Sequence, residues 1–133
     1  MTWTDLARIP VWTGFGALLL IILMMLDSLF TRYKDFQEIK AGNVAVTTRF
    51  MMKLFAQSII LYQAISKSSD MWEALILSIV SFIVLLVLEW FIRILLKALI
   101  DLRLDQGIRE GKVAYALFAG SIHLAGALII GAI

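Results

Sequence analysis

Four stretches of apolar residues, each at least 20 residues long, constrain this chain more than any other feature. They run over 11–30, 44–65, 72–99 and 113–133. A transmembrane helix needs roughly 20 apolar residues to cross about 30 Å of hydrocarbon. Because 62% of the 133 residues are hydrophobic, a soluble domain of this size could not bury them all. The sequence therefore predicts an all-α polytopic membrane protein, with four transmembrane helices in a single membrane domain over residues 1–133.

The sequence contains few residue types that support catalysis or metal binding. It has no cysteine and a single histidine, so a thiolate or histidine-cluster metal site is not expected. We find no nucleotide-binding loop and no nucleophile–base arrangement. The net charge of +2 is too small to indicate nucleic-acid binding. We therefore expect a non-enzymatic protein with no catalytic residue, no metal and no cofactor, whose Pro10 precedes the first span.

The distribution of lysine and arginine predicts the orientation of the spans. Cytoplasmic loops of membrane proteins carry an excess of these residues. Two cations, Arg8 and Lys67, lie on one side of the predicted spans. Seven lie on the other side: Arg32, Lys34, Lys40, Lys97, Arg103, Arg109 and Lys112. We therefore expect both termini and the 66–71 turn outside the cytoplasm, and the 31–43 and 100–112 connections inside it.

A short motif occurs twice, just before the second and fourth spans. Residues 37–45 read QEIKAGNVA and residues 106–114 read QGIREGKVA, an offset of 69. The copies align Gly42 and Asn43 with Gly111 and Lys112. This pattern predicts two parallel two-helix repeats, over about 11–66 and about 72–133.

The same region resembles a known family. The segments AGNVAV at 41–46 and EGKVAYALFAGSIHLAGALIIGAI at 110–133 resemble the signature of the YjfL-like inner-membrane family, domain of unknown function 350. The resemblance covers roughly residues 15–133, with Lys112 departing from the Asn43 of the first copy. It implies a small four-helix protein of the bacterial inner membrane, whose genes often lie near envelope-stress genes of the phage-shock type. It implies no particular activity.

Ionisable and polar residues within the spans form a candidate site. They are Asp27, Arg49, Lys53, Gln57, Glu89, Arg93 and His123. Such residues are costly in a membrane and usually face the bundle interior in pairs. Depth along the helices predicts three pairs, Asp27–Arg49, Lys53–Glu89 and Glu89–Arg93. Three cations against two acids leave one cation without a partner inside the chain.

Two interpretations of these charges stay open. They could line a polar path that enters from the cytoplasm, or they could be structural ion pairs with Arg49 and Arg93 reaching the headgroups. Asp101, Asp105 and Glu110 are expected in a solvated connection that could dock a cytoplasmic partner.

Small residues follow one face of the last span. They are Ala116, Gly120, Ala127 and Gly131, with His123 on the same face. Such residues let helices approach closely, so His123 is expected to form an interhelical hydrogen bond. Together with the unpaired cation, this face predicts a homo-oligomer.

Two functions are compatible with these features. The first is a scaffold in the inner membrane, in contact with the lipid bilayer and with a cytoplasmic envelope-stress protein. The second is a small oligomeric ion or proton channel or transporter that uses the region of Lys53, Glu89 and His123. A wetted cavity that reaches Lys53 would favour transport, whereas a dry, paired bundle would favour the scaffold.

Overall fold

Six α-helices make up the residues described by the computed structural model, 2–29 and 34–133. Four of them are long and apolar enough to cross a membrane. In chain order the helices are α1 (Trp3–Ser28), α2 (Asp35–Lys40), α3 (Val44–Lys67), α4 (Met71–Ile100), α5 (Leu104–Arg109) and α6 (Val113–Ala132). The all-α, four-span prediction is therefore confirmed.

The first helix begins earlier than the hydropathy pattern indicated. Thr2 and Asp5 form a capping box, in which each side chain accepts a hydrogen bond from the backbone N–H of the other. This cap satisfies free N–H groups at the helix start, so α1 begins at Trp3 and Pro10 lies inside it. The predicted end of this span at Phe30, and the cation Arg32, lie outside the described residues. The other spans begin and end within two residues of their predicted limits.

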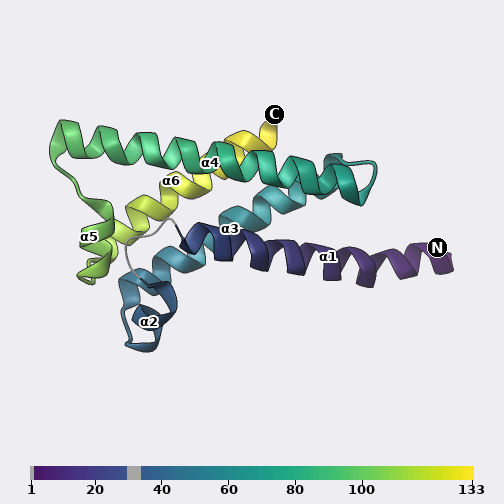
Figure 1. Cartoon of the computed structure of the whole chain (residues 1–133), viewed down its shortest axis with the longest axis horizontal. Helices are drawn as coiled ribbons and strands as arrows, with labels where there is room; N and C mark the ends of the chain where they lie inside the picture. Colours follow the sequence, from purple (N-terminus) through teal and green to yellow (C-terminus); the bar gives the residue numbers. More distant parts are fainter. Residues whose placement is uncertain (1, 30–33) are drawn as a thin grey trace.

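Helix α3 forms the centre of the molecule and packs against α1, α4 and α6, most extensively against α6 (Figure 1). One apolar cluster joins α1, α3 and α4 through Leu23, Leu61 and Phe82. A second joins α3, α4 and α6 and includes Ile60 and Leu85. The remaining apolar surface of the long helices is largely exposed, as expected for helices that face lipid.

Both termini and the turn between α3 and α4 lie toward one end of the molecule, and α2 and α5 lie toward the other (Figure 1). The two short helices occupy the 31–43 and 100–112 connections between the spans. Helix α5 is held by an apolar cluster in which its Leu104 and Ile108 pack with Val46 of α3 and Ala116 of α6. The relative placement of the ends agrees with the predicted arrangement, while the cytoplasmic side stays a prediction.

The two copies of the sequence motif have the same local backbone. Gly42 and Gly111 have positive φ angles of 85° and 88°, and each follows a six-residue helix and precedes a long one. In each copy the glycine and its successor donate backbone hydrogen bonds to the helix that ends there, as in a Schellman motif. A left-handed residue at this position favours glycine. The duplication of the whole two-helix unit stays a prediction.

Asn43 and Lys112, at matching positions of the two motifs, make different contacts. The Asn43 side chain accepts a hydrogen bond from the N–H of Val46 and donates one, at 3.0 Å, to the backbone carbonyl of Arg109. Asn43 therefore caps α3 and joins the two motifs. The Lys112 side chain makes no cap hydrogen bond to α6.

The small-residue face of α6 packs against α3 of the same chain. Ala116, Gly120, His123, Ala127 and Gly131 are all buried. A Cβ atom at Gly120 would lie 2.2 Å from Sδ of Met52, and one at Gly131 would lie 2.7 Å from Cγ of Gln63. The predicted close helix contact is therefore intramolecular, and this face no longer supports association with a second copy.

Candidate functional site

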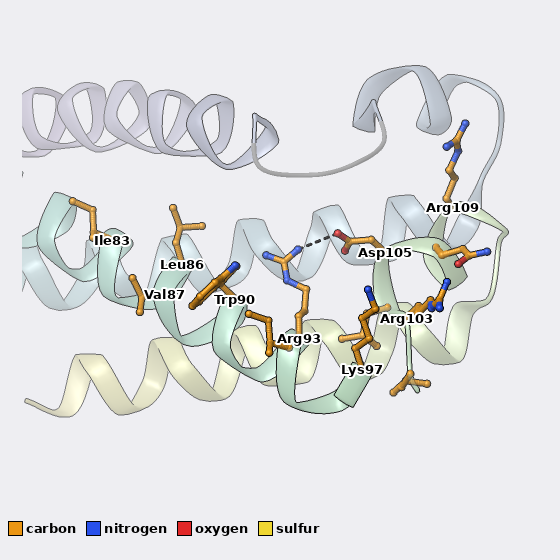
Figure 2. Close-up of a pocket in the computed structure, with 13 residues that line it drawn as sticks. Ile83, Leu86, Val87, Trp90, Arg93, Lys97, Arg103, Asp105 and Arg109 are labelled. Atoms are coloured by element: carbon orange, nitrogen blue, oxygen red, sulfur yellow. Dashed lines mark hydrogen bonds and ion pairs between the residues drawn. The ribbon is translucent and has the colours of Figure 1, made fainter. Parts of the chain in front are cut away.

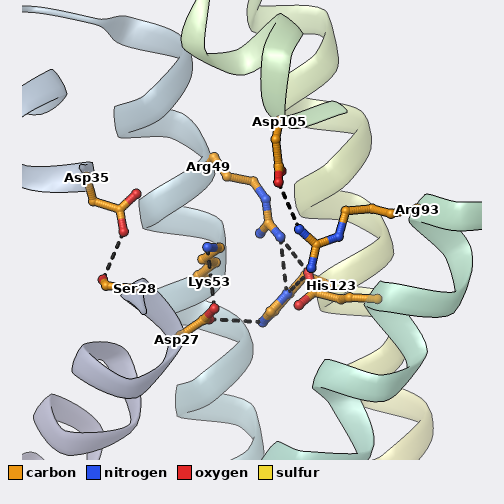
Figure 3. Close-up of polar contacts among 9 residues, drawn as sticks. Asp27, Ser28, Asp35, Arg49, Lys53, Arg93, Asp105 and His123 are labelled. Carbon is orange, nitrogen blue, oxygen red and sulfur yellow. Dashed lines mark hydrogen bonds and ion pairs between the residues drawn. The ribbon is translucent and has the colours of Figure 1, made fainter. Parts of the chain in front are cut away.

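A cluster of charged and polar side chains lies where α1, α3, α4 and α6 meet (Figure 3). Helix α1 contributes Asp27, α4 contributes Glu89 and α6 contributes His123. Helix α3 contributes Arg49, Lys53 and Gln57, which follow one another at intervals of four residues and so share a face. All six of these predicted site residues are buried. The seventh, Arg93, lies at the edge of the cluster with a side chain that is 30% exposed.

The ion pairs within this cluster differ from the predicted pairs. Arg49 Nη2 donates to Glu89 Oε1 at 2.5 Å, and Lys53 Nζ lies 3.4 Å from Asp27 Oδ1. The predicted pairs Asp27–Arg49 and Lys53–Glu89 are therefore wrong. The depth of each residue in the membrane could not distinguish the predicted pairs from the observed ones. One helical turn is about 5.4 Å, and long basic side chains extend over that distance. The direction in which each side chain leaves α3 decides its partner.

His123 lies between Asp27 and Glu89, the two acids of this cluster. Its Nδ1 atom contacts Oε1 of Glu89, and its Nε2 atom lies 4.0 Å from Oδ2 of Asp27. Arg49 Nη2 is 3.5 Å from the same Nδ1 atom. The expected interhelical contact of His123 is thus present, with Glu89 of α4 as its partner. The imidazole thus lies between the two ion pairs, in direct contact with Glu89, while Nε2 of His123 and Oδ2 of Asp27 have no hydrogen-bond partner among the described residues.

Arg93 of α4 pairs with an acid that lies outside the transmembrane helices. Its Nη1 atom donates to Oδ2 of Asp105 at 3.0 Å, so the predicted Glu89–Arg93 pair is wrong. Asp105, expected in a solvated connection, is instead partly buried at α5. The chain turns back after α4 at Asp101, which has a left-handed φ of 53°, and this turn brings Asp105 to Arg93. The cation predicted to be without a partner therefore has one in the same chain.

The space beside the network is small. A cavity of about 10 Å³ is bordered by Arg49, Glu89, Arg93 and Asp105. A single water needs roughly 10–15 Å³ of such volume. The Arg93–Asp105 pair therefore lies next to the buried pairs, with room for about one water at the boundary.

Two buried polar side chains have no hydrogen-bond partner within residues 2–29 and 34–133. Both amide atoms of Gln57 and the hydroxyl of Ser78 are in this position. An unpaired polar group inside a protein costs free energy. Gln57 was predicted as part of the site, whereas Ser78 was not, because a serine in an apolar span has no distinct sequence signal.

Asp35 at the start of α2 was also missed. The Asp35 carboxylate accepts a hydrogen bond from the Ser28 hydroxyl at 2.9 Å, and Asp35 is buried. Burial raises the pKa of Asp35 above its ordinary value, although nearby Lys53 and the Ser28 hydrogen bond oppose the shift. The burial of Asp35 has no sequence signal, because this residue lies in a polar connection.

Comparison with known proteins agrees with the resemblance drawn from the sequence motifs. A family model described as "Domain of Unknown Function (DUF350)" matches residues 1–133, which is the full chain. The chain belongs to this family. No curated protein and no solved structure matches it significantly. Membership of this family assigns no activity to the buried network.

Proposed function

We propose that this DUF350 chain is a non-enzymatic scaffold of the bacterial inner membrane. The supporting observation is that the buried charges pair with one another. Arg49 has Glu89, Lys53 has Asp27, and His123 lies between the two pairs. Pairing compensates much of the cost of removing charges from water and fixes which helix faces meet. The network then maintains a specific arrangement of α1, α3, α4 and α6, as a scaffold requires.

The end of the molecule that carries α2 and α5 would bind the partner. It presents exposed charges of both signs, including Lys40, Glu110 and Lys112. In our proposal this end faces the cytoplasm, both termini are outside, and the partner is a cytoplasmic protein of envelope maintenance or stress. The excess of lysine and arginine at this end supports the orientation.

A small ion or proton channel or transporter is the second candidate. Two observations favour it: His123 lies between two carboxylates, and Gln57 is buried without a hydrogen-bond partner among the described residues. Intramembrane ionisable groups often mark ion or proton pathways. We retain association of copies as part of both proposals, because the long helices expose much apolar surface.

Complementation with two sets of variants separates the candidates. A strain lacking the gene is stressed with a membrane-damaging agent and given the Lys40→Glu/Lys112→Glu chain or the Asp27→Leu/Lys53→Met chain. The first changes exposed charges only, and the second replaces a buried pair with apolar residues, which can be nearly neutral for stability. A scaffold should lose rescue with the exposed pair changed and retain it with the buried pair replaced. The opposite result, in chains present at equal amounts in the membrane, would refute the scaffold and favour transport.

Flux measurements provide a second readout. The purified chain is reconstituted into vesicles that contain a pH-sensitive dye, and a proton or potassium gradient is imposed. A scaffold should give dissipation no faster than empty vesicles. Dissipation that depends on the protein and is lost in Asp27→Leu/Lys53→Met would instead support the channel.

A further inference from the structure

A groove lies between the second half of α4 and the segment that turns back into α5 (Figure 2). Its volume is about 720 Å³. The wall from α4 carries apolar side chains followed by basic ones, and the other wall comes from residues 102–109. Across the groove, Arg93 of α4 pairs with Asp105 of α5. The groove is therefore apolar along one part of its length and cationic at its other end.

The apolar part has the length of one membrane leaflet. Its apolar residues on α4 lie between Ile83 and Ile94, about 16 Å at about 1.5 Å per residue, and Arg93, which is paired with Asp105, lies near the polar end of this stretch. Half of a hydrocarbon core of about 30 Å is about 15 Å. Lys97 follows almost one helical turn later. A molecule with its apolar part along Ile83–Ile94 would thus place its polar end beside the basic residues.

The polar end of the groove has an excess of positive charge. Lys97, Arg103 and Arg109 line it and are exposed. Asp105 is the one acid among the lining residues, and it is already paired with Arg93. Arg103 has an exposed contact with Asp101 at 3.6 Å, and such surface pairs are weak. Lys97 and Arg109 form no ion pair within the described part of the chain. The groove end therefore fits an anion.

We infer that this groove binds an anionic phospholipid of the surrounding leaflet. The phosphate would lie beside Lys97 and Arg103, which are close together in Figure 2, and an acyl chain would run past Trp90 toward Ile83. Ile83, Val87 and Trp90 are more than half exposed, on a helix that faces lipid. Basic pockets next to transmembrane helices bind anionic headgroups. The site goes beyond the proposed function and does not depend on it.

Native mass spectrometry of the full chain in mild detergent tests this inference. The probes are phosphatidylglycerol and phosphatidylcholine with identical acyl chains. Phosphatidylglycerol should be retained preferentially, and each neutralised groove cation should lower that preference about fivefold. Lys97→Gln/Arg103→Gln should therefore lose most of this preference. Lys40→Gln, which removes an exposed cation of α2 outside the groove, should change it little. Equal retention of the two lipids, or equal loss in both variants, would overturn the proposal.

A photo-crosslinking residue in place of Trp90 identifies what covers the apolar wall. In vesicles that contain phosphatidylglycerol, the expected adduct has the mass of one phospholipid. A cross-link to a second copy of the chain or to another protein would overturn the lipid site. Inorganic phosphate serves as a competitor, since it has the anionic charge without acyl chains. Displacement of the lipid by millimolar phosphate would show an anion site without lipid selectivity, which would also contradict the proposal.

Discussion

Arg49 and Lys53 lie one helical turn apart on α3, yet each meets an acid from a different helix. Arg49 pairs with Glu89 of α4, and Lys53 pairs with Asp27 of α1. Glu89 has a second partner in His123, whereas within the described residues Arg49 has no other acid. Removing Glu89 should therefore change the stability of the protein by a different amount from removing Arg49.

We predict strong coupling between Arg49 and Glu89. Removing one partner of a buried pair typically costs about 3–5 kcal/mol, whereas replacing both with apolar residues is often nearly neutral. Glu89→Leu should be the more damaging single variant, because Arg49 then has no acid, while in Arg49→Met the imidazole of His123 still contacts Glu89. The double variant should recover most of the stability, measured as the melting temperature in detergent. Lys112→Gln, which removes an exposed pair with Glu110, is the control and should have little effect. Additive losses in the double variant would show that the two side chains do not meet.

A second prediction at this scale concerns Asp35 and pH. Burial raises the pKa of this carboxyl above 3.8. Between pH 3.8 and the raised pKa, the carboxyl therefore stays protonated in the folded protein but ionises in the unfolded chain. The stability that results is present below pH 3.8 and is lost as the pH rises through the raised pKa. Asp35→Asn cannot ionise, and its side-chain oxygen still accepts from Ser28. The melting temperature of the variant relative to the wild type should therefore increase from about pH 4 to about pH 7. A difference that is constant or decreasing over this range would contradict the assignment.

At the scale of elements, the α3–α6 contact depends on the absence of side chains on α6. A Cβ at Gly120 would lie 2.8 Å from Cβ of Met52 as well as 2.2 Å from its Sδ. Rotation of the methionine side chain relieves only the second contact, so the helices themselves must separate. From the sequence, this face also predicts a contact with another copy, because small residues indicate a close neighbouring helix without identifying it.

We predict that Gly120→Ala destabilises the protein by about 1–3 kcal/mol, the usual cost of overpacking a core. Gly14→Ala is the matched control, because a Cβ there meets nothing within 4 Å. The control should be neutral or slightly stabilising, since alanine restricts the unfolded chain. Melting temperatures in detergent measure both effects. Equal stability of the two variants would show that α6 does not approach α3 this closely.

At the scale of the whole molecule, both termini lie toward the same end as the turn between α3 and α4 (Figure 1). An even number of spans requires this arrangement. It does not state which end faces the cytoplasm, and that choice depends on the distribution of lysine and arginine. Three described cations of the groove, Lys97, Arg103 and Arg109, lie at the opposite end from Lys67.

We predict that both termini face outward from the cytoplasm. A reporter fused after Ile133 should be active only if it functions outside the cytoplasm, as alkaline phosphatase does. A fusion in the α4–α5 connection should show the reverse pattern and serves as the control. Activity of a cytoplasm-only reporter after Ile133 would reverse the orientation, and the partner-binding end would then face outward.

The four spans could be predicted from the sequence alone, because apolar length and composition are local properties. The depth of each charge follows from its position in a span, so the members of the buried cluster were also predictable. Which acid each cation pairs with could not be predicted, because the side chains of Arg49 and Lys53 can each reach acids over a full helical turn. The rotation and crossing of the helices decide which acid each one meets. The turn at Asp101, which brings Asp105 to Arg93 and forms the groove, depends on the apolar contacts of α5 with α3 and α6. These contacts join residues far apart in the chain, and therefore only the tertiary structure decided them.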